Sequence, residues 1–207
     1  HKKKWSVNEV LFLLQQISSA YLILEKLNIC HRDIKPHNIV ISRDGYPKLI
    51  DFSTSKIIET GEKVYDCNGT LGYLAPEKRR FQANTYKPSI ADVYSMGLTI
   101  CDIFSENSFR SLEDLSDILK TDYKILDVLL LKMLETNPMN RITWSEIHQY
   151  SKLDIANQAK AIDMLKSDSL RTYFEKVKYE ADINDNLRSQ FRLALIYAYG
   201  FEDIVPD

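Results

Sequence analysis

Two polar runs in the first quarter of the chain carry side chains that could take part in catalysis. Residues 31–38 contain Asp33, Lys35 and Asn38, and a second run begins with Asp51. Phosphoryl transfer needs such groups: a carboxylate that orients an attacking hydroxyl, a cation beside the moving phosphate, and oxygen ligands for Mg²⁺. Each residue alone is most often a surface or turn residue, so the hypothesis depends on their combination and order.

A short β-hairpin is predicted between the two runs. Residues 39–41 and 48–50 are rich in aliphatic side chains, and Asp44-Gly45 between them is a common hairpin turn. Pro47 has no amide hydrogen and must therefore lie at an edge of the strand pair. One rigid strand pair would thus hold the loops that carry the polar side chains.

The other elements expected in the first 151 residues are helices. They are predicted at residues 7–27, 90–104, 125–134 and from about 144. Capping boxes, in which a serine or threonine and a glutamate three residues later bond each other's backbone, begin at Ser6 and at Thr143. Residues 90–104 are apolar on nearly every side, which predicts a fully buried helix. The long polar stretch after residue 50 shows little periodicity, which is uncommon unless such a connection carries function.

Composition and charge restrict the classes of protein that fit this sequence. With 207 residues, 44% of them apolar, the chain is sufficient for one buried core, which excludes disorder over most of its length. A net charge of -2 argues against nucleic acid or an anionic membrane as the main partner. No run approaches the roughly 20 apolar residues that span a bilayer. The three cysteines form no C-x-x-C pair, which favours free thiols and an intracellular, cytoplasmic location.

Taken together and in order, the motifs resemble those of the eukaryotic protein kinase family. They are His31-Arg32-Asp33 with Asn38, Asp51-Phe52-Ser53, Gly69-Thr70-Leu71-Gly72-Tyr73-Leu74, Ala75-Pro76-Glu77, Asp92-Val93-Tyr94-Ser95-Met96-Gly97, and Arg141 after Asn137-Pro138. These six matches cover residues 7 to about 150. Lys35-Pro36 together with Gly69-Thr70 resembles the serine/threonine-specific branch of the family.

The resemblance implies a role for each matching polar residue. Asp33 would be the catalytic base for the substrate hydroxyl, and Lys35 would neutralise the γ-phosphate of ATP. Asn38 and Asp51 would bind Mg²⁺ and, with Lys35, the nucleotide. Thr70 would contact both Asp33 and Lys35. The implied cofactors are therefore ATP and Mg²⁺.

Other matching residues would be structural. Residues 51–77 resemble the activation loop of the family. The resemblance implies that Glu77 pairs with Arg141 to anchor the far end of this loop. It also implies that Asp92 hydrogen-bonds the backbone of the catalytic loop, which corresponds to residues 31–38. His31 and Phe52 would serve in packing.

The expected fold is mainly α. Residues 1–151 would form a protein-kinase-like C-terminal lobe with one small β-hairpin, and residues 152–207 a C-terminal helical extension with helices at 153–165, 170–179 and 187–199. The expected function is transfer of the ATP γ-phosphoryl group to serine or threonine of a protein substrate. The extension could also bind a protein partner through a helical surface.

Three departures from the family pattern are visible. No glycine-rich loop, V-A-I-K lysine or partner glutamate of the N-terminal lobe is found, which predicts a fragment that is inactive alone. Ser53 replaces a glycine, and its β-carbon restricts the backbone angles there. Residues 105–121, where the family has a substrate-docking helix, look shortened.

The position of Asp66 leads to a hypothesis about regulation. Asp66 occupies the position of the activating phosphate in many relatives, so we expect its charge to lie opposite Arg32 and partly replace a phosphate. A solvated acidic residue is the alternative interpretation. Thr60 and Tyr65 are further phosphorylation candidates by location.

Two readings other than an active enzyme remain open. One is a pseudokinase, a non-catalytic interaction or scaffold module that retains the shape of the lobe. The intact set Asp33, Lys35, Asn38 and Asp51 opposes this reading, whereas Ser53 and the missing N-terminal lobe favour it. The other assigns the biological role to helix-mediated docking by residues 152–207.

Overall fold

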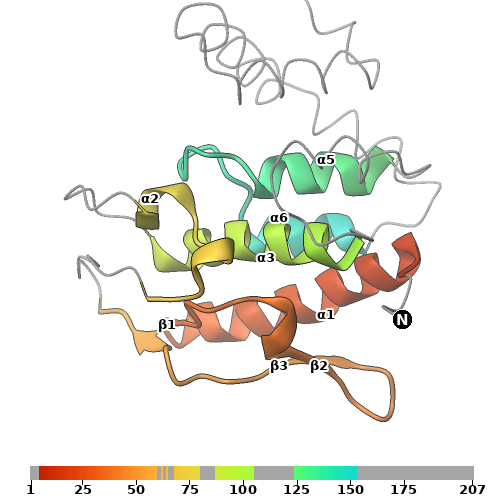
Figure 1. The fold of residues 1–207 in the computed structure, drawn as a ribbon, viewed down its shortest axis with the longest axis horizontal. Helices are drawn as coiled ribbons and strands as arrows, with labels where there is room; N and C mark the ends of the chain where they lie inside the picture. The colour runs from red at the N-terminus through yellow and green to blue at the C-terminus, as the bar shows by residue number, and fades with distance from the viewer. Residues whose placement is uncertain are drawn as a thin grey trace, which may run out of the picture.

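The computed structural model describes residues 5–59, 62, 64, 68–79, 87–104 and 124–152. Their elements follow one another along the chain as coloured in Figure 1. They are α1 (Val7–Lys26), β1 (Ile29–Cys30), the 3-10 turn η1 (Pro36–Asn38), β2 (Ile39–Ile41), β3 (Pro47–Leu49), β4 (Lys56–Ile57), the 3-10 turn η2 (Leu71–Tyr73), α2 (Pro76–Arg79), α3 (Pro88–Phe104), α5 (Lys124–Met133) and α6 (Trp144–Ser151).

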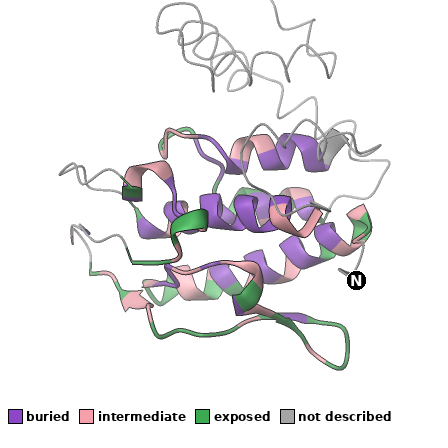
Figure 2. Ribbon diagram, in the orientation of Figure 1, coloured by how far each residue is buried: buried purple, intermediate pink, exposed green. Residues whose placement is uncertain are grey.

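Helices form the core, as the sequence predicts. α1 packs against α6, and α3 packs against α5. The buried residues of α1 run from Val10 to Tyr21, and the Tyr21 ring stacks on Trp144 of α6 with centroids 4.1 Å apart. In α3 every residue from Ala91 to Cys101 is buried, and Figure 2 shows this helix in purple through the middle of the molecule. The predicted buried helix is therefore present, although Ile90 and residues 102–104 at its ends are only partly buried.

Both predicted capping boxes are present. The Ser6 hydroxyl accepts a hydrogen bond from the amide of Glu9, and the Glu9 carboxylate accepts one from the amide of Ser6 at 2.8 Å. Thr143 and Glu146 repeat this arrangement at the start of α6. Each box satisfies amide groups that the first turn of a helix leaves unpaired, so these sequence patterns locate the helix starts.

The predicted hairpin is present as well. β2 and β3 are antiparallel, Val40 lies opposite Lys48, and Pro47 ends the pairing opposite Ile41. Gly45 in the turn has φ +82°, a left-handed conformation that glycine adopts without steric cost.

A second strand pair corrects the prediction of a single hairpin. β1 and β4 are antiparallel, with Ile29 opposite Ile57 and Cys30 opposite Lys56. Each strand has two residues, too few for an alternating pattern, and the partners lie far apart in the sequence. This pair brings the segment that follows Asp51 back to the end of α1.

α1 is similar in length and composition to a membrane-spanning helix. Among the described residues it is the one helix long and apolar enough to cross a membrane by length and composition alone, which the sequence analysis did not anticipate. Seven of its residues are buried within the protein, and it packs against α6. This packing is that of a core helix.

Several expectations fall outside the described residues. These are the C-terminal helices at 153–165, 170–179 and 187–199, and the shortened segment at 105–121.

Candidate active site

A buried carboxylate fixes the backbone at residues 31 and 32. Asp92 of α3 accepts hydrogen bonds from the amide of His31 at 3.0 Å, from the amide of Arg32 at 2.9 Å, and from the hydroxyl of Tyr21. Burial raises the pKa of Asp92, while the hydrogen bonds from Tyr21 and Arg32 oppose this rise. Arg32 has φ +73°, a left-handed conformation that side chains disfavour, so the backbone there must be held in place. Asp33 follows directly.

Three neighbours surround the carboxylate of Asp33. Its Oδ1 accepts hydrogen bonds from the amide and the hydroxyl of Thr70, at 2.9 and 2.8 Å. Its Oδ2 accepts from Lys35 Nζ at 2.8 Å and from Asn38 Nδ2 at 3.1 Å. Burial would raise the pKa of Asp33, but the hydrogen bonds from Lys35 and Thr70 outweigh it and lower the pKa. Asp33 is therefore an ionised, oriented carboxylate at neutral pH.

Lys35 closes a triangle with Asp33 and Thr70. Its ammonium group donates to the hydroxyl of Thr70 at 2.7 Å as well as to Asp33. The Lys35 side chain keeps 21% of its surface exposed, so the cation can also be reached from solvent.

Asn38 and Asp51 supply oxygen atoms beside this triangle. Asn38 is the last residue of η1. Its backbone carbonyl accepts a hydrogen bond from the amide of Ile50 at 2.9 Å, so the residue before Asp51 lies next to Asn38. Its Nδ2 donates to the backbone carbonyl and to the carboxylate of Asp33, which directs the amide oxygen away from them. Asp51 is exposed, and the charges of Asp33 and Lys35 act on its carboxylate.

The hydroxyl of Ser53 contacts the carboxylate of Asp51. Ser53 Oγ donates to Asp51 Oδ1 at 2.6 Å, and the Ser53 amide donates to the same oxygen at 3.3 Å. These bonds from Ser53 lower the pKa of Asp51. The serine at this position therefore orients the carboxylate directly, in addition to restricting the backbone.

The donor set suits Mg²⁺. Carboxylate and amide oxygens are the ligands that this hard cation takes, usually from one or two protein groups together with substrate phosphates. Within the described ranges, no group of three or more His, Cys, Asp or Glu side chains is arranged to hold a metal without such help.

A buried ion pair anchors α2. Arg141 donates to both carboxylate oxygens of Glu77, at 2.6 and 2.9 Å, and to the carbonyl of Ile90 at 2.9 Å. The Arg141 side chain is fully buried. α2 follows directly on the segment that carries Thr70, so this pair positions Thr70 from its C-terminal side.

His31 and Phe52 are in contact. The His31 ring is fully buried, with Nε2 at 2.9 Å from the carbonyl of Ile50. Its edge faces the Phe52 ring at a centroid distance of 4.8 Å. The contact joins the two polar runs.

Comparison with known proteins identifies the family. The family model described as protein kinase domain matches residues 1–152. The chain is 39% identical over 104 residues to the mouse PAS domain-containing serine/threonine-protein kinase (50% of this chain, 7% of the relative). It is 34% identical over 159 residues to serine/threonine-protein kinase cds1 of Schizosaccharomyces pombe (67% and 34%). It is 28% identical over 152 residues to dual specificity protein kinase zak2 of Dictyostelium discoideum (70% and 24%). The chain belongs to the eukaryotic serine/threonine protein kinase family.

This kinase chain spans between 7% and 34% of the length of these three relatives. For the family the residues 31–38 are called the catalytic loop, and residues 51–77 the activation segment. The structure brings Asp33, Lys35, Asn38 and Thr70 into direct contact. Asp51 adjoins them through the backbone bond between Ile50 and Asn38.

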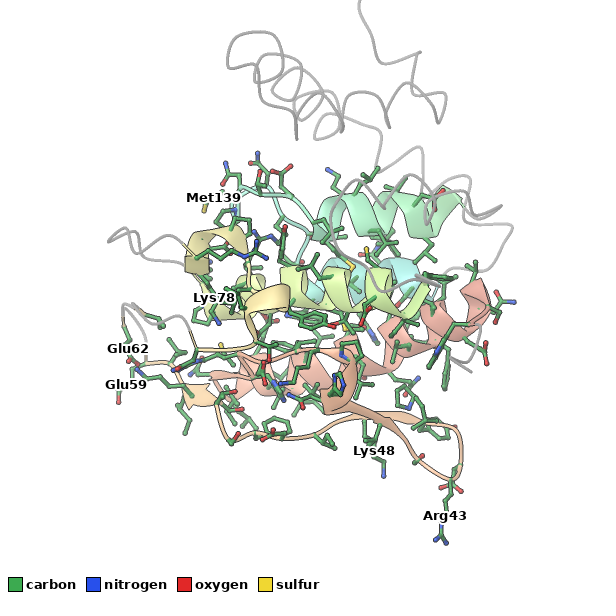
Figure 3. All side chains as sticks on the ribbon, in the orientation of Figure 1. Arg43, Lys48, Glu59, Glu62, Lys78 and Met139 are labelled. Atoms are coloured by element: carbon green, nitrogen blue, oxygen red, sulfur yellow. The ribbon has the colours of Figure 1, made fainter. Side chains whose placement is uncertain are left out.

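Asp66, Thr60 and Tyr65 lie outside the described residues, but the charge of Arg32 acts weakly on another acidic residue of the activation segment, Glu62. Glu62 accepts a hydrogen bond from Lys56 of β4 and one from the amide of Glu59 at 3.0 Å, and Figure 3 labels both glutamates at this edge. The bond from Lys56 lowers the pKa of Glu62, with a smaller contribution from the charge of Arg32. Glu62 was not predicted from the sequence, because no pattern links it to Lys56 or to Arg32.

The burial of Lys78 was not predicted from the sequence either. Lys78 of α2 is 4% exposed, whereas the neighbouring Arg79 is exposed. In the sequence both belong to one run of charges, which usually marks a solvated face, so no local signal separates them.

Proposed function

We propose that this chain forms the catalytic C-terminal lobe of a protein kinase that transfers the γ-phosphoryl group of ATP to a serine or threonine hydroxyl of a protein substrate. The observation that carries the proposal is the closed triangle of Asp33, Lys35 and Thr70, extended by Asn38. A scaffold has no chemical need for this arrangement of charges.

Asp33 is proposed as the catalytic base. The substrate oxygen forms a bond to the γ-phosphorus, the bond from that phosphorus to the bridging oxygen of ADP breaks, and the hydroxyl proton passes to Asp33. Thr70 and Asn38 hold the carboxylate in one orientation for this step. Base catalysis of this kind contributes about 10²–10⁴ in rate.

Lys35 is proposed to contact the transferring phosphate. Its ammonium lies 2.8 Å from the Asp33 carboxylate, so a hydroxyl held by Asp33 would have a cation beside it. Positive charge at this point stabilises the negative charge on the phosphoryl oxygens.

Asn38 and Asp51 are the residues proposed to hold Mg²⁺. When bound, the cation neutralises charge on the phosphates of ATP. Ser53 supports Asp51 by donating to Oδ1, which leaves Oδ2 for ligation.

We propose further that residues 1–207 support little transfer by themselves. The six glycines of the sequence form no phosphate-binding loop, so ATP would be held from one side only. For residues 152–207 we propose docking of a protein partner through a helical surface.

The test is transfer of labelled phosphate from ATP to a library of serine and threonine peptides. The protein should be expressed from its natural reading frame, beside residues 1–207 alone. Asp33→Asn should lower the rate by about 10²–10⁴. Asp44→Asn, the same change at an exposed hairpin turn, is the matched control and should leave the rate unchanged. An inactive wild type that also binds no Mg-ATP would favour the pseudokinase, and an active Asp33→Asn would overturn the role of Asp33.

A further inference from the structure

We propose that Lys78 is a positioning residue for catalysis, and that its buried ammonium group joins the catalytic loop to the activation segment so that Asp33 and Thr70 stay in register. The proposal rests on the proposed kinase function. The first observation is the burial of Lys78, which no sequence pattern predicts. Lys78 extends from α2 into the protein with 4% of its surface exposed (Figure 3).

A buried lysine requires partners, because an ammonium group loses its hydration on burial. Lys78 Nζ donates to the carbonyl of Asn68 at 2.6 Å and to the carbonyl of Arg32 at 3.4 Å. Its charge also acts on the buried carboxylate of Asp92. An apolar side chain could fill the same volume without the cost of desolvation. The role of Lys78 therefore lies in the contacts of its ammonium group and not in filling space.

The contact with Arg32 completes a clamp on one residue. The amide of Arg32 donates to Asp92, and its carbonyl accepts from Lys78. Arg32 thus lies between a buried anion and a buried cation, with its backbone in the left-handed region. The carbonyl of Arg32 belongs to the peptide that leads into Asp33, so the clamp acts directly on the orientation of the proposed base.

The contact with Asn68 reaches the other side of the site. Asn68 precedes Gly69 and Thr70, and the amide and hydroxyl of Thr70 donate to Asp33. Lys78 therefore links the backbones on both sides of the Asp33–Thr70 contact. Both of these contacts are made to backbone carbonyls, so Lys78 acts on the site through the backbone.

The first measurement is the kinetics of Lys78→Met, which keeps an unbranched side chain one atom shorter and removes the ammonium. We expect kcat to fall roughly 10- to 100-fold, since a displacement near 1 Å at a reacting group can cost about 10²-fold. The KM for ATP should change little, because the nucleotide ligands are untouched. Lys26→Met removes the same charge from an exposed lysine at the end of α1 and should match the wild type.

The second measurement is hydrogen exchange by mass spectrometry on the same proteins. Lys78→Met should speed exchange in peptides that cover residues 31–35 and 68–74, while α6 stays as protected as in the wild type. If Lys78→Met does not fold, Lys78→Gln replaces it. The fall in kcat and the rise in hydrogen exchange should then have the same direction and a smaller magnitude.

The two proposals fail in different ways. An inactive wild type would overturn the proposed function, and hydrogen exchange would still decide the role of Lys78. An active wild type with unchanged kcat in Lys78→Met would overturn the role of Lys78 alone. Unchanged exchange in both peptides would overturn it as well.

Discussion

Gly69 approaches the catalytic loop so closely that a β-carbon built on it would lie 2.6 Å from the carbonyl oxygen of Arg32. The same β-carbon would lie 2.9 Å from Cδ2 of Leu74, and Gly69 has φ +124°, where side chains are rarely found. Two independent causes, close approach and backbone conformation, therefore favour glycine at this position. Thr70, which contacts Asp33, is the next residue.

Gly69→Ala should destabilise the protein by about 1–3 kcal/mol, the cost of a residue forced into a sparsely populated conformation, with further loss from the contact with Arg32. Urea unfolding measures this. Gly72→Ala is the matched control, because among the described residues no atom lies within 4 Å of a β-carbon built on Gly72. Equal midpoints for the two variants would contradict the prediction.

Activity of Gly69→Ala should fall as well, because movement of this turn displaces Thr70 from Asp33. Transfer of phosphate to the peptide library measures this. A destabilised variant with full activity at a temperature where it is folded would show that the contact serves stability alone.

The sequence predicts much of the fold, for reasons that are local. The two capping boxes, the Asp44-Gly45 turn and the apolar α3 each depend on side chains a few residues apart, whose chemistry determines the element. The catalytic-loop motif also predicts which polar residues gather, since Asp33, Lys35 and Asn38 lie within one short loop.

What the sequence could not predict depends on contacts between distant segments. The strands β1 and β4 are too short for a pattern, and the left-handed backbone of Arg32 is imposed by Asp92 of α3. Lys78 reaches from α2 to the backbone carbonyl of Arg32, and Glu62 bonds Lys56 of β4. Such features follow from the fold and not from the neighbouring residues.

Loss of the ion pair between Glu77 and Arg141 should be costly. Glu77→Gln leaves the fully buried guanidinium of Arg141 without its counter-charge, and removal of one partner of a buried pair typically costs about 3–5 kcal/mol. Thermal or urea unfolding measures this. Glu59→Gln, at an exposed position, is the control and should leave the midpoint nearly unchanged. A midpoint for Glu77→Gln equal to that of the control would show that the pair contributes no net stability.

The buried thiols should be unreactive in the folded protein. Burial raises the pKa of Cys30 to about 12 and raises the pKa of Cys101 further, so neither forms appreciable thiolate near pH 8. Iodoacetamide at pH 8 should leave the peptides of both cysteines unmodified until the protein is unfolded. Modification of either under native conditions, detected by mass spectrometry, would contradict their burial.

The same pKa shifts predict loss of stability in alkali. A thiol whose pKa is raised by folding contributes stability below its ordinary pKa of 9.0, and this contribution is lost as the pH rises toward about 12. The melting temperature should therefore fall from pH 8 to pH 10.5. Cys30→Ala should make this fall shallower than in the wild type, and an identical pH dependence would exclude the thiol as a cause.

The pair of Glu62 and Lys56 should order the activation segment by charge. Glu62 bonds Lys56 and feels a smaller attraction from the charge of Arg32, so Glu62→Gln removes an anion that both cations act on and should reduce phosphoryl transfer, with a rise in hydrogen exchange over residues 56–64. Because Lys56 lowers the pKa of Glu62 below its ordinary 4.5, the contribution is complete at neutral pH and is lost as acid titrates through the lowered value.

Asp66→Asn separates the two acidic candidates for the site opposite Arg32. Reduced activity in Glu62→Gln with none lost in Asp66→Asn would assign the charge to Glu62, and the reverse result would assign it to Asp66.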